Sequence, residues 1–260
     1  MYKFDVKKVT DDLIKWIQDW FEKNGKGCNA VLGMSGGKDS TIAAALLAKA
    51  LGPERVIGVA MPDTNQSIND ADKICEYLGI KYMEVPIWGM TGAFHRIIDD
   101  ACCDFEWSKQ AEQNIPPRIR MTTLFAISQT FNGRVIETSN LSENYIGYLT
   151  IFGDGAGSVS PLGDLTVTEV LQIGDYLELP YEWVHKVPDD GLPHSTSDEV
   201  KIGFSYAELD KLIREGIVPE GMCTNDPNIT KEEKILGMYR NSQFKRDIVR
   251  IPTFRPNVDE

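Results

Sequence analysis

The apolar residues of this chain fall into two kinds of pattern that alternate along its first half. Short apolar runs, which are typical of buried strands, occupy residues 28–33, 55–61, 81–87 and 133–138. Between and after these runs, apolar side chains recur at helical spacing. The expected helices are 10–21, 39–51, 67–78, 88–100, a long one from about 117 to 131, a short one capped by Ser139 or Asn140, 168–179 and 230–243.

Strands that alternate with helices of about a dozen residues indicate right-handed βαβ crossovers. We therefore expect an α/β fold, with a doubly wound, Rossmann-like parallel sheet and helices on both of its faces. The chain of 260 residues shows no internal repeat and no long linker, so a single domain is expected. In such a sheet a ligand lies beyond the carboxyl ends of the strands.

The charge of the chain excludes some classes of partner. Its formal net charge is −12, whereas nonspecific binding to nucleic acids or membrane surfaces needs a basic field. The five cysteines form neither a zinc-type pair nor a disulfide framework, and no apolar run resembles a signal core or a membrane span. We expect a cytoplasmic protein with reduced thiols and with no nucleic-acid or membrane partner, in which a local site holds any polyanionic substrate.

A glycine loop between the first strand and its helix is the strongest chemical signal. Gly36 and Gly37 leave no Cβ in the way, so successive N–H groups can converge on an anion. The helix that follows adds free N–H groups and a dipole that favour phosphate. The spacing is not that of a Walker A loop, and two glycines alone would indicate only a turn. The run therefore predicts a phosphate-binding loop. Its resemblance to the loop of the ATP pyrophosphatase families implies ATP binding by Gly33, Met34, Ser35, Gly36, Gly37, Lys38, Asp39 and Ser40.

Two carboxylates are placed to share a magnesium ion. Asp39 and Glu143 each lie just past the carboxyl end of a predicted strand. A Mg²⁺ ion that neutralises ATP phosphates usually takes one or two carboxylates together with phosphate oxygens and water. Glu143 also suits an ordinary capping box, and Lys38 can either hold a phosphate oxygen or be solvated, so both alternatives stay open.

Further residues are expected around the same crevice. Met61 ends the second strand and would line an adenine pocket, although a methionine before a proline is also ordinary structure. Proline lacks an N–H, so we expect the long helix to start near Pro117, with Arg118 in its first turn. The helix dipole does not favour an arginine there, which indicates a bound anion or a carboxylate partner. Residues 152–161 and 188–200 are expected to form a flexible loop and a mobile lid.

The loop 33–40 resembles the S-G-G-x-D-S loop of the ATP pyrophosphatase (PP-loop) families, which cleave ATP between its α- and β-phosphates. Over most of its length the chain resembles the ammonia-dependent NAD synthetases of that superfamily. The segments that carry this resemblance are Gly33 to Ser40, Asn114-x-x-x-Arg118-x-Arg120-Met121, Thr138 with Glu143, Phe152-Gly153-Asp154-Gly155, Ser160 to Thr166, Ser197-Asp198-Glu199 and Lys245-Arg246.

The resemblance implies a fold of the adenine nucleotide alpha hydrolase type and a ligase reaction. Nicotinate adenine dinucleotide (deamido-NAD) would be adenylated by ATP with release of pyrophosphate, and ammonia would then displace AMP to give NAD. It implies that Thr138 helps the loop to hold ATP, that Asp39 and Glu143 form the catalytic metal site, and that Arg118 and Lys245 bind the dinucleotide. It also implies a homodimer. Only about 30 residues precede the loop, too few for a fused glutaminase, so free ammonia or a separate partner is expected to supply nitrogen.

Five positions depart from the better-known members of this family. They are Ile151, Ser158, Val167, Asp189 and Phe244, where those members carry lysine, aspartate, lysine, threonine and histidine. Losing a charged contact to a phosphate typically costs on the order of 1.5–3 kcal/mol. The alternatives are therefore a PP-loop adenylating enzyme that acts on a different carboxylic acid or on an RNA base, and a catalytically inactive nucleotide-binding homologue.

Overall fold

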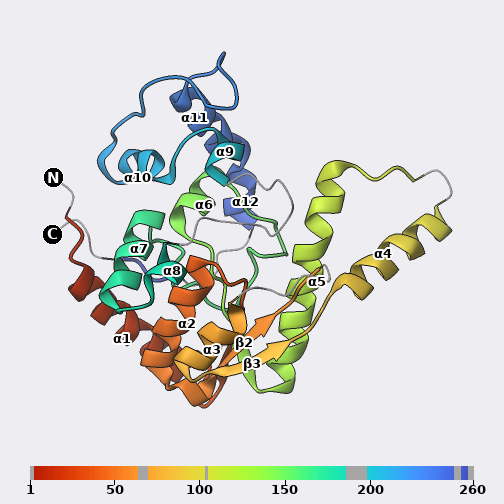
Figure 1. Cartoon of the computed structure of the whole chain (residues 1–260), viewed down its shortest axis with the longest axis vertical. Coiled ribbons are helices and arrows are strands. Elements are labelled where there is room, and N and C mark those ends of the chain that lie inside the picture. The colour runs from red at the N-terminus through yellow and green to blue at the C-terminus, as the bar shows by residue number, and fades with distance from the viewer. Residues whose placement is uncertain (1–2, 64–69, 103–104, 186–197, 249–252, 257–260) are drawn as a thin grey trace.

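Four short parallel strands form the centre of the molecule (Figure 1). β1 (Asn29–Gly33) pairs with β2 (Val56–Ala60) on one side and with β4 (Gly133–Val135) on the other, and β3 (Lys81–Glu84) pairs with β2. The order of strands is thus β3-β2-β1-β4. The computed structural model describes residues 3–63, 70–102, 105–185, 198–248 and 253–256.

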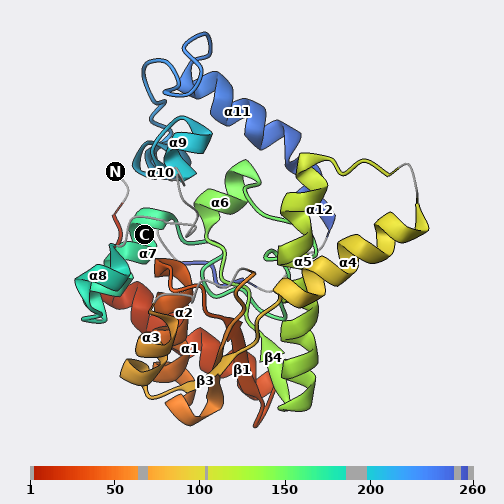
Figure 2. The same ribbon diagram turned by 45° about the vertical axis from the view of Figure 1, so that its right-hand side comes forward.

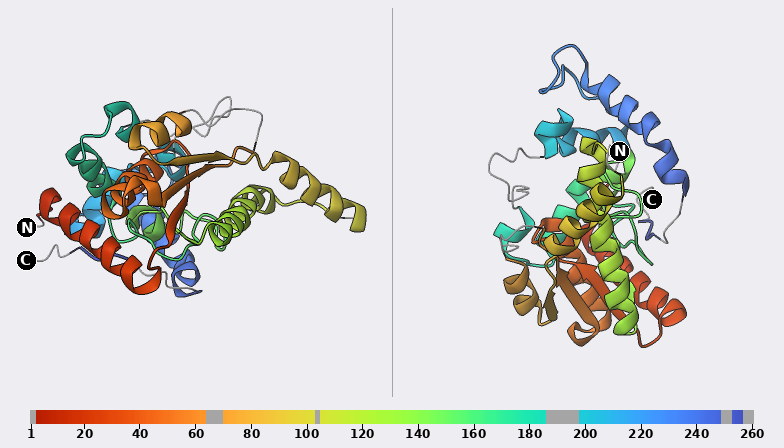
Figure 3. Two further views of the ribbon diagram at one scale, coloured as in Figure 1. Left: turned by 90° about the horizontal axis from the view of Figure 1, so that it is seen from below. Right: turned by 90° about the vertical axis from the view of Figure 1, so that its right-hand side faces the viewer.

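Helices cover both faces of the sheet, which confirms the doubly wound α/β fold. The main core cluster joins one face, including Ala30 and Leu32 of β1, to helices α1, α2, α3 and α7. Val31 points to the other face, where it packs in a cluster with Leu124 and other side chains of α5. In the left view of Figure 3 the red and orange helices and the yellow-green helix α5 lie on opposite sides of the strands. Burial on both faces explains why β2 is apolar or glycine at every position.

Most of the predicted helices are present with shifted ends. The expected helix at 67–78 begins at Ala71, and residues 64–69 lie outside the described ranges. The expected helix at 230–243 ends at Asn241, and a separate helix begins at Gln243. The helices up to the third strand are α1 (Val6–Asn24), α2 (Lys38–Leu51), the 3₁₀ helix η1 (Pro53–Arg55) and α3 (Ala71–Leu78). The later ones are α4 (Trp88–Ala101), α5 (Lys109–Thr130), α6 (Leu141–Ile146), α7 (Val167–Tyr176), α8 (Tyr181–Val184), α9 (Asp198–Ile202), α10 (Tyr206–Glu215), α11 (Lys231–Asn241) and α12 (Gln243–Ile248).

The expected start of the long helix near Pro117 is wrong. α5 begins at Lys109, where the Ser108 hydroxyl caps it by accepting a hydrogen bond from the N–H of Ala111, and it continues through Pro116 and Pro117. Two prolines remove helical hydrogen bonds and crowd the preceding turn. However, α5 packs against β1, β4 and α4. We attribute its continuity to this packing, which outweighs the local preference.

A second, smaller layer lies above the carboxyl ends of the strands (Figure 2). It is built from α6, α7, α9, α10 and α11 around a separate apolar cluster. The members of this cluster include Ile146, Val167, Phe204, Leu209 and Ile235. Side chains of this layer can therefore approach the carboxyl ends of the strands from the side that faces away from the sheet.

The loops that were expected to be mobile have different outcomes. Residues 152–161 contain no helix or strand, as expected, but the end of this loop is buried and bridges Ile136 through Val159. Of the expected lid at 188–200, residues 188–197 lie outside the described ranges and residues 198–200 belong to α9. The four cysteines within the described ranges are free thiols. None of the described helices is both long and apolar enough to span a membrane.

A buried ion pair fixes α10 to α7. Arg214 donates to both oxygens of Glu169, whose side chain is only 2% exposed, and to the carbonyl of Asp164. Because Arg214→Met would leave a buried carboxylate without its cation, we expect it to lower the free energy of unfolding by about 3–5 kcal/mol in urea titrations. Lys7→Met, which breaks an exposed pair on α1, is the matched control and should leave the midpoint unchanged. Equal midpoints for both variants would contradict a structural role for the buried pair.

Candidate active site

The strand order places a topological switch point at the carboxyl ends of β1 and β4, where a doubly wound fold has its ligand crevice. The chain leaves β1 toward β2 and β3 and later returns to the other side of β1 as β4. Loops that follow neighbouring strands on the two sides of such a switch point diverge, and a ligand can enter between them. The loop 33–40 and residues 136–143 are these two loops.

The loop 33–40 has the backbone of an anion cradle. Gly36 has a φ of 74°, which favours glycine, and Gly37 precedes α2 as an N-cap without a side-chain hydrogen bond. Ser35 accepts a hydrogen bond from the N–H of Gly37, with 3.2 Å between nitrogen and oxygen, and its hydroxyl lies 3.2 Å from that of Ser40. The first N–H groups of α2 are therefore left for a ligand.

Met34 faces the core and not the crevice. Its side chain is 1% exposed and lies against Gly58 of β2, where a Cβ atom would stand 2.6 Å from Cγ of Met34. Its N–H also donates to the carbonyl of Val59 at 2.8 Å. Only the backbone of Met34 is thus available to a nucleotide, and the side chain anchors the loop to the neighbouring strand.

Lys38 is largely shielded from solvent and paired with Asp39, so the solvated alternative is wrong. Its ammonium lies 2.9 Å from Oδ2 of Asp39, and the two side chains are 13% and 17% exposed. Burial disfavours the charged ammonium, but the carboxylates of Asp39 and Glu143 outweigh this effect and raise the pKa of Lys38. The loop therefore carries a fixed positive charge beside its aspartate.

Asn140 joins Asp39 to the second loop. Its Nδ2 donates to Oδ1 of Asp39 at 3.2 Å, while its Oδ1 accepts from the N–H of Glu143 at 3.0 Å. Glu143 in turn accepts from the N–H of Asn140 through Oε2. The capping-box interpretation of Glu143 is confirmed, with Asn140 and not Ser139 as the cap. Asn140 is expected from the sequence only as a cap. Its position shortly after a strand whose carboxyl end lies beside the loop 33–40 was the signal that could have indicated its contact with Asp39.

The two carboxylates lie close enough to affect each other. Burial, reinforced by the charge of Asp39, raises the pKa of Glu143 to about 8. No donor among the described residues contacts Oε1 of Glu143. Within the described ranges, no group of three or more His, Cys, Asp or Glu side chains is arranged to hold a metal ion. Two carboxylates with one uncommitted oxygen nevertheless fit a Mg²⁺ ion that completes its coordination with phosphate oxygens and water.

Met61 and Thr138 lie at the strand ends as the sequence predicts. Met61 is 3% exposed, and its Cε lies 3.5 Å from the position of a Cβ atom on Gly33. Its carbonyl accepts a hydrogen bond from Nε of Arg120 at 3.0 Å. Thr138 is half-buried and lies three residues beyond the end of β4. The structure thus brings Met61 beside the start of the loop 33–40.

Arg118 and Lys245 both contact the segment 147–151, which follows α6. Arg118 is the tenth residue of α5, so the prediction that it occupies a first turn is wrong, and its exposed side chain donates to the carbonyl of Ile151 at 3.3 Å. Lys245 donates to the carbonyls of Gly147 and Leu149 at 2.7 and 2.6 Å, which ties α12 to the end of α6. Burial lowers the pKa of Lys245, against the opposing charge of Asp154.

The positions that depart from the resembled family differ in environment. Val167 is buried in the smaller apolar cluster, where it starts α7, and Phe244 is 55% exposed. Ser158 and Ile151 are half-buried, and the Ser158 N–H donates to the carbonyl of Val135 at 2.7 Å. Asp189 lies outside the described ranges. At Val167 an apolar side chain in the core thus replaces the expected charged contact.

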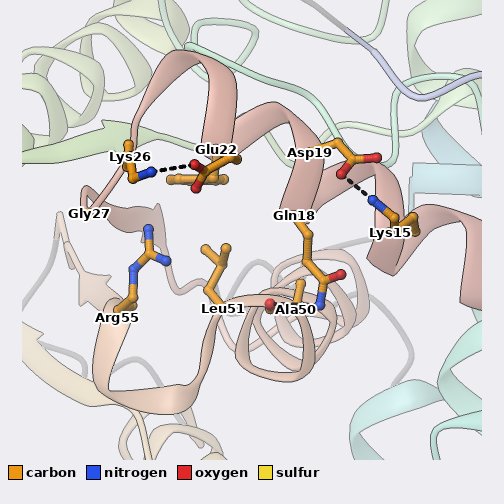
Figure 4. A pocket seen from close by; sticks show the side chains of 10 residues that line it. Lys15, Gln18, Asp19, Glu22, Lys26, Gly27, Ala50, Leu51 and Arg55 are labelled. Atoms are coloured by element: carbon orange, nitrogen blue, oxygen red, sulfur yellow. Dashed lines mark hydrogen bonds and ion pairs between the residues drawn. The ribbon is translucent and has the colours of Figure 1, made fainter.

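A hollow of about 320 Å³ lies at the other end of the sheet, between α1 and the segment 50–55 (Figure 4). Its charged side chains are already engaged. Lys26 pairs with Glu22, Lys15 pairs with Asp19, and Arg55 donates to the carbonyl of Cys28. This hollow therefore offers few groups to a ligand, and the polar chemistry lies at the carboxyl ends.

The shifted pKa of Glu143 has a consequence for stability. The unfolded chain ionises this group near 4.5, whereas the folded protein keeps it protonated to about pH 8, so stability should fall as pH rises across this window. Glu143→Gln keeps an acceptor for the capping box. In urea titrations without Mg²⁺, we expect the unfolding free energy of Glu143→Gln to fall less steeply with pH than that of the wild type. The difference should be clearest between pH 7 and 8. Below pH 7, Glu137, whose pKa is about 7, causes a similar fall in both proteins.

The exposed Glu22→Gln is the control for this titration and should match the wild-type slope. Identical slopes for Glu143→Gln and the wild type would mean that Glu143 is ionised in the folded protein at neutral pH.

The chain matches known proteins over nearly its whole length. A family model described as NAD synthase matches residues 9–249. An NH(3)-dependent NAD(+) synthetase from Archaeoglobus fulgidus is 35% identical over 93% of this chain and 95% of that protein. Among solved structures, an NMN synthetase from Francisella tularensis is 30% identical with a TM-score of 0.82, covering 97% of this chain and 100% of that one.

An NH3-dependent NAD synthetase from Campylobacter jejuni, solved with nitrate ion, is 29% identical with a TM-score of 0.71 and covers 95% of this chain and 99% of that one. The family match and the identity to the Archaeoglobus protein extend over both loops of the crevice described above. The chain therefore belongs to the NAD synthase family.

Proposed function

We propose that this protein is an ammonia-dependent ligase that converts nicotinate adenine dinucleotide to NAD at the expense of ATP, with AMP and pyrophosphate as the other products. The observation that carries this proposal is the joining of Asp39 and Glu143 through Asn140 at the mouth of the phosphate loop. The family and the curated relatives named NH(3)-dependent NAD(+) synthetase support the identity of the reaction.

The proposed chemistry proceeds in two steps. An oxygen of the nicotinate carboxylate attacks the α-phosphorus of ATP, and the bond to the β-phosphate breaks with release of pyrophosphate. Ammonia then attacks the acyl carbon of the adenylate, AMP leaves, and one proton is lost to solvent. A Mg²⁺ ion bound by Asp39 and Glu143 would neutralise phosphate charge when present.

The protein contributes mainly by positioning. The backbone of residues 33–40 would orient the triphosphate, and Lys38 would supply a fixed positive charge next to Asp39. Met61, which follows β2, and Thr138, three residues beyond β4, would bound the nucleoside end of ATP. We assign Arg118 and Lys245 to the dinucleotide, each through donors that its backbone contacts leave uncommitted.

A mononucleotide is a second candidate acceptor. The Francisella relative, with a TM-score of 0.82, is named an NMN synthetase. Ile151, Ser158 and Val167 also leave this chain with fewer charged groups than the resembled family offers to its substrates. Nicotinate mononucleotide carries the same reacting carboxylate without the adenylate half of the dinucleotide.

The deciding experiment measures pyrophosphate release and amide formation with ATP, Mg²⁺ and ammonium. Nicotinate adenine dinucleotide, nicotinate mononucleotide and no acceptor form its three arms. We expect release to depend on the dinucleotide and to match NAD formed. Asp39→Asn, which keeps an acceptor for Lys38 and Asn140 but removes the negative charge, should abolish release. A kcat/KM at least tenfold higher for the mononucleotide would identify that acceptor instead. Release in no arm would reject the ligase.

We also propose that the protein forms a homodimer through α4. Figure 1 shows this helix projecting from the body of the molecule beside α5. Met90, Phe94 and Ile97 recur along it at helical spacing and are 41%, 46% and 63% exposed, with Trp88 at its start and Phe105 beyond its end also exposed. An apolar stripe of this size on a projecting helix indicates a protein interface.

A charge in this stripe tests the dimer. We expect Ile97→Glu to shift the wild-type dimer toward monomer in light scattering at micromolar concentration, because a buried, unpaired carboxylate opposes association. Val218→Glu introduces the same charge at another exposed apolar position and is expected to leave the mass unchanged. A monomeric wild type at these concentrations would reject the proposed interface.

A further inference from the structure

Tyr206 combines deep burial with an unsatisfied hydroxyl. Its side chain is 5% exposed at the first position of α10, yet no hydrogen-bond partner for its oxygen exists among the described residues. An unpaired buried hydroxyl costs free energy that an apolar residue of the same shape would not cost. At the edge of a candidate site, we expect a bound ligand to supply the hydrogen-bond partner that this hydroxyl lacks.

The ring of Tyr206 reaches the phosphate loop from the smaller layer. Nζ of Lys38 lies 5.9 Å from the centre of the ring, above its face. Burial, followed by the negative charges of Glu143 and Asp198, raises the pKa of Tyr206, so its hydroxyl remains protonated at all physiological pH values. It can therefore act as a hydrogen-bond donor.

Polar side chains near Tyr206 have hydrogen-bond partners, whereas the Tyr206 hydroxyl has none among the described residues. The hydroxyl of Tyr148 donates to Oδ1 of Asp198 at 3.0 Å. Asp39 accepts from Lys38 and Asn140. The unsatisfied atom is thus not a sign of a generally loose region.

The backbone of Tyr206 is held on both sides. Its N–H donates to Oε1 of Glu199 at 2.7 Å, and Ser205 forms a capping box with Glu208. The ion pair of Arg214 with Glu169 fixes the far end of the same helix to α7. The ring, which packs in the apolar cluster of the smaller layer and lies beside Lys38, is therefore carried by a rigid element, as a substrate contact requires.

We propose that the Tyr206 hydroxyl donates a hydrogen bond to a phosphoryl oxygen of ATP bound on residues 33–40. A phosphoryl oxygen suits this donor because it is anionic and has free lone pairs, whereas a metal-bound water has a lone pair engaged by the metal. The identity of the nucleotide rests on the proposed function. The contact makes the smaller layer part of the ATP site.

Tyr206→Phe tests the contact by removing one oxygen atom. We expect the melting temperature without ATP to be unchanged or higher, because the variant loses an unsatisfied buried group. The affinity for ATP with Mg²⁺, measured by calorimetry without acceptor, and kcat/KM for ATP should each fall about 10- to 100-fold, the range for a hydrogen bond to a charged group. The KM for ammonium should not change.

Tyr82→Phe is the matched control, since its hydroxyl binds Glu84 on β3 and it should leave both ATP measurements unchanged. Unchanged ATP affinity and kinetics in Tyr206→Phe would overturn the proposal, whatever its melting temperature. A rise confined to the KM for ammonium would overturn it as well. If the wild type bound ATP but released no pyrophosphate with any acceptor, the ligase would be rejected, and the calorimetric comparison would still test Tyr206.

Discussion

The geometry of the site depends on one amide side chain. Asn140 donates to Asp39 on the β1 side of the crevice and accepts from the N–H of Glu143 on the β4 side. A single residue therefore fixes the distance between two loops that are separated by about a hundred residues in sequence. Two ionised carboxylates would repel each other at close range. The neutral amide of Asn140, the ammonium of Lys38 and the raised pKa of Glu143, which keeps that group protonated at neutral pH, make their proximity tolerable.

The main sheet and the glycine turn between β1 and α2 could be predicted from the sequence because both follow from local patterns. Buried parallel strands are continuous apolar runs, and the cradle needs glycines at fixed spacing before a helix. The order of the strands then places the loop 33–40 beside the residues that follow β4. The proximity of Asp39 and Glu143 could be anticipated because each follows the carboxyl end of a strand, and these two strands are neighbours.

The remaining features depend on contacts between distant segments. Pro116 and Pro117 argue locally against a helix, yet α5 passes through them along the sheet. The burial of Lys38 and the approach of Tyr206 both require the smaller layer, whose apolar cluster joins five helices that no periodicity links together. Local sequence could suggest what each of these residues is capable of, but not which neighbours it meets.

The contact of Met34 with Gly58 bears on how tightly a nucleotide can be held. A glycine on β2 leaves a socket that the side chain of Met34 fills, so the phosphate loop is attached to the sheet at its first turn. A loop that is already ordered loses little conformational entropy when a ligand arrives, and more of the interaction energy is retained as affinity. The hydrophobic core of this protein thus contributes to anion binding through pre-organisation, although none of its atoms would touch the anion.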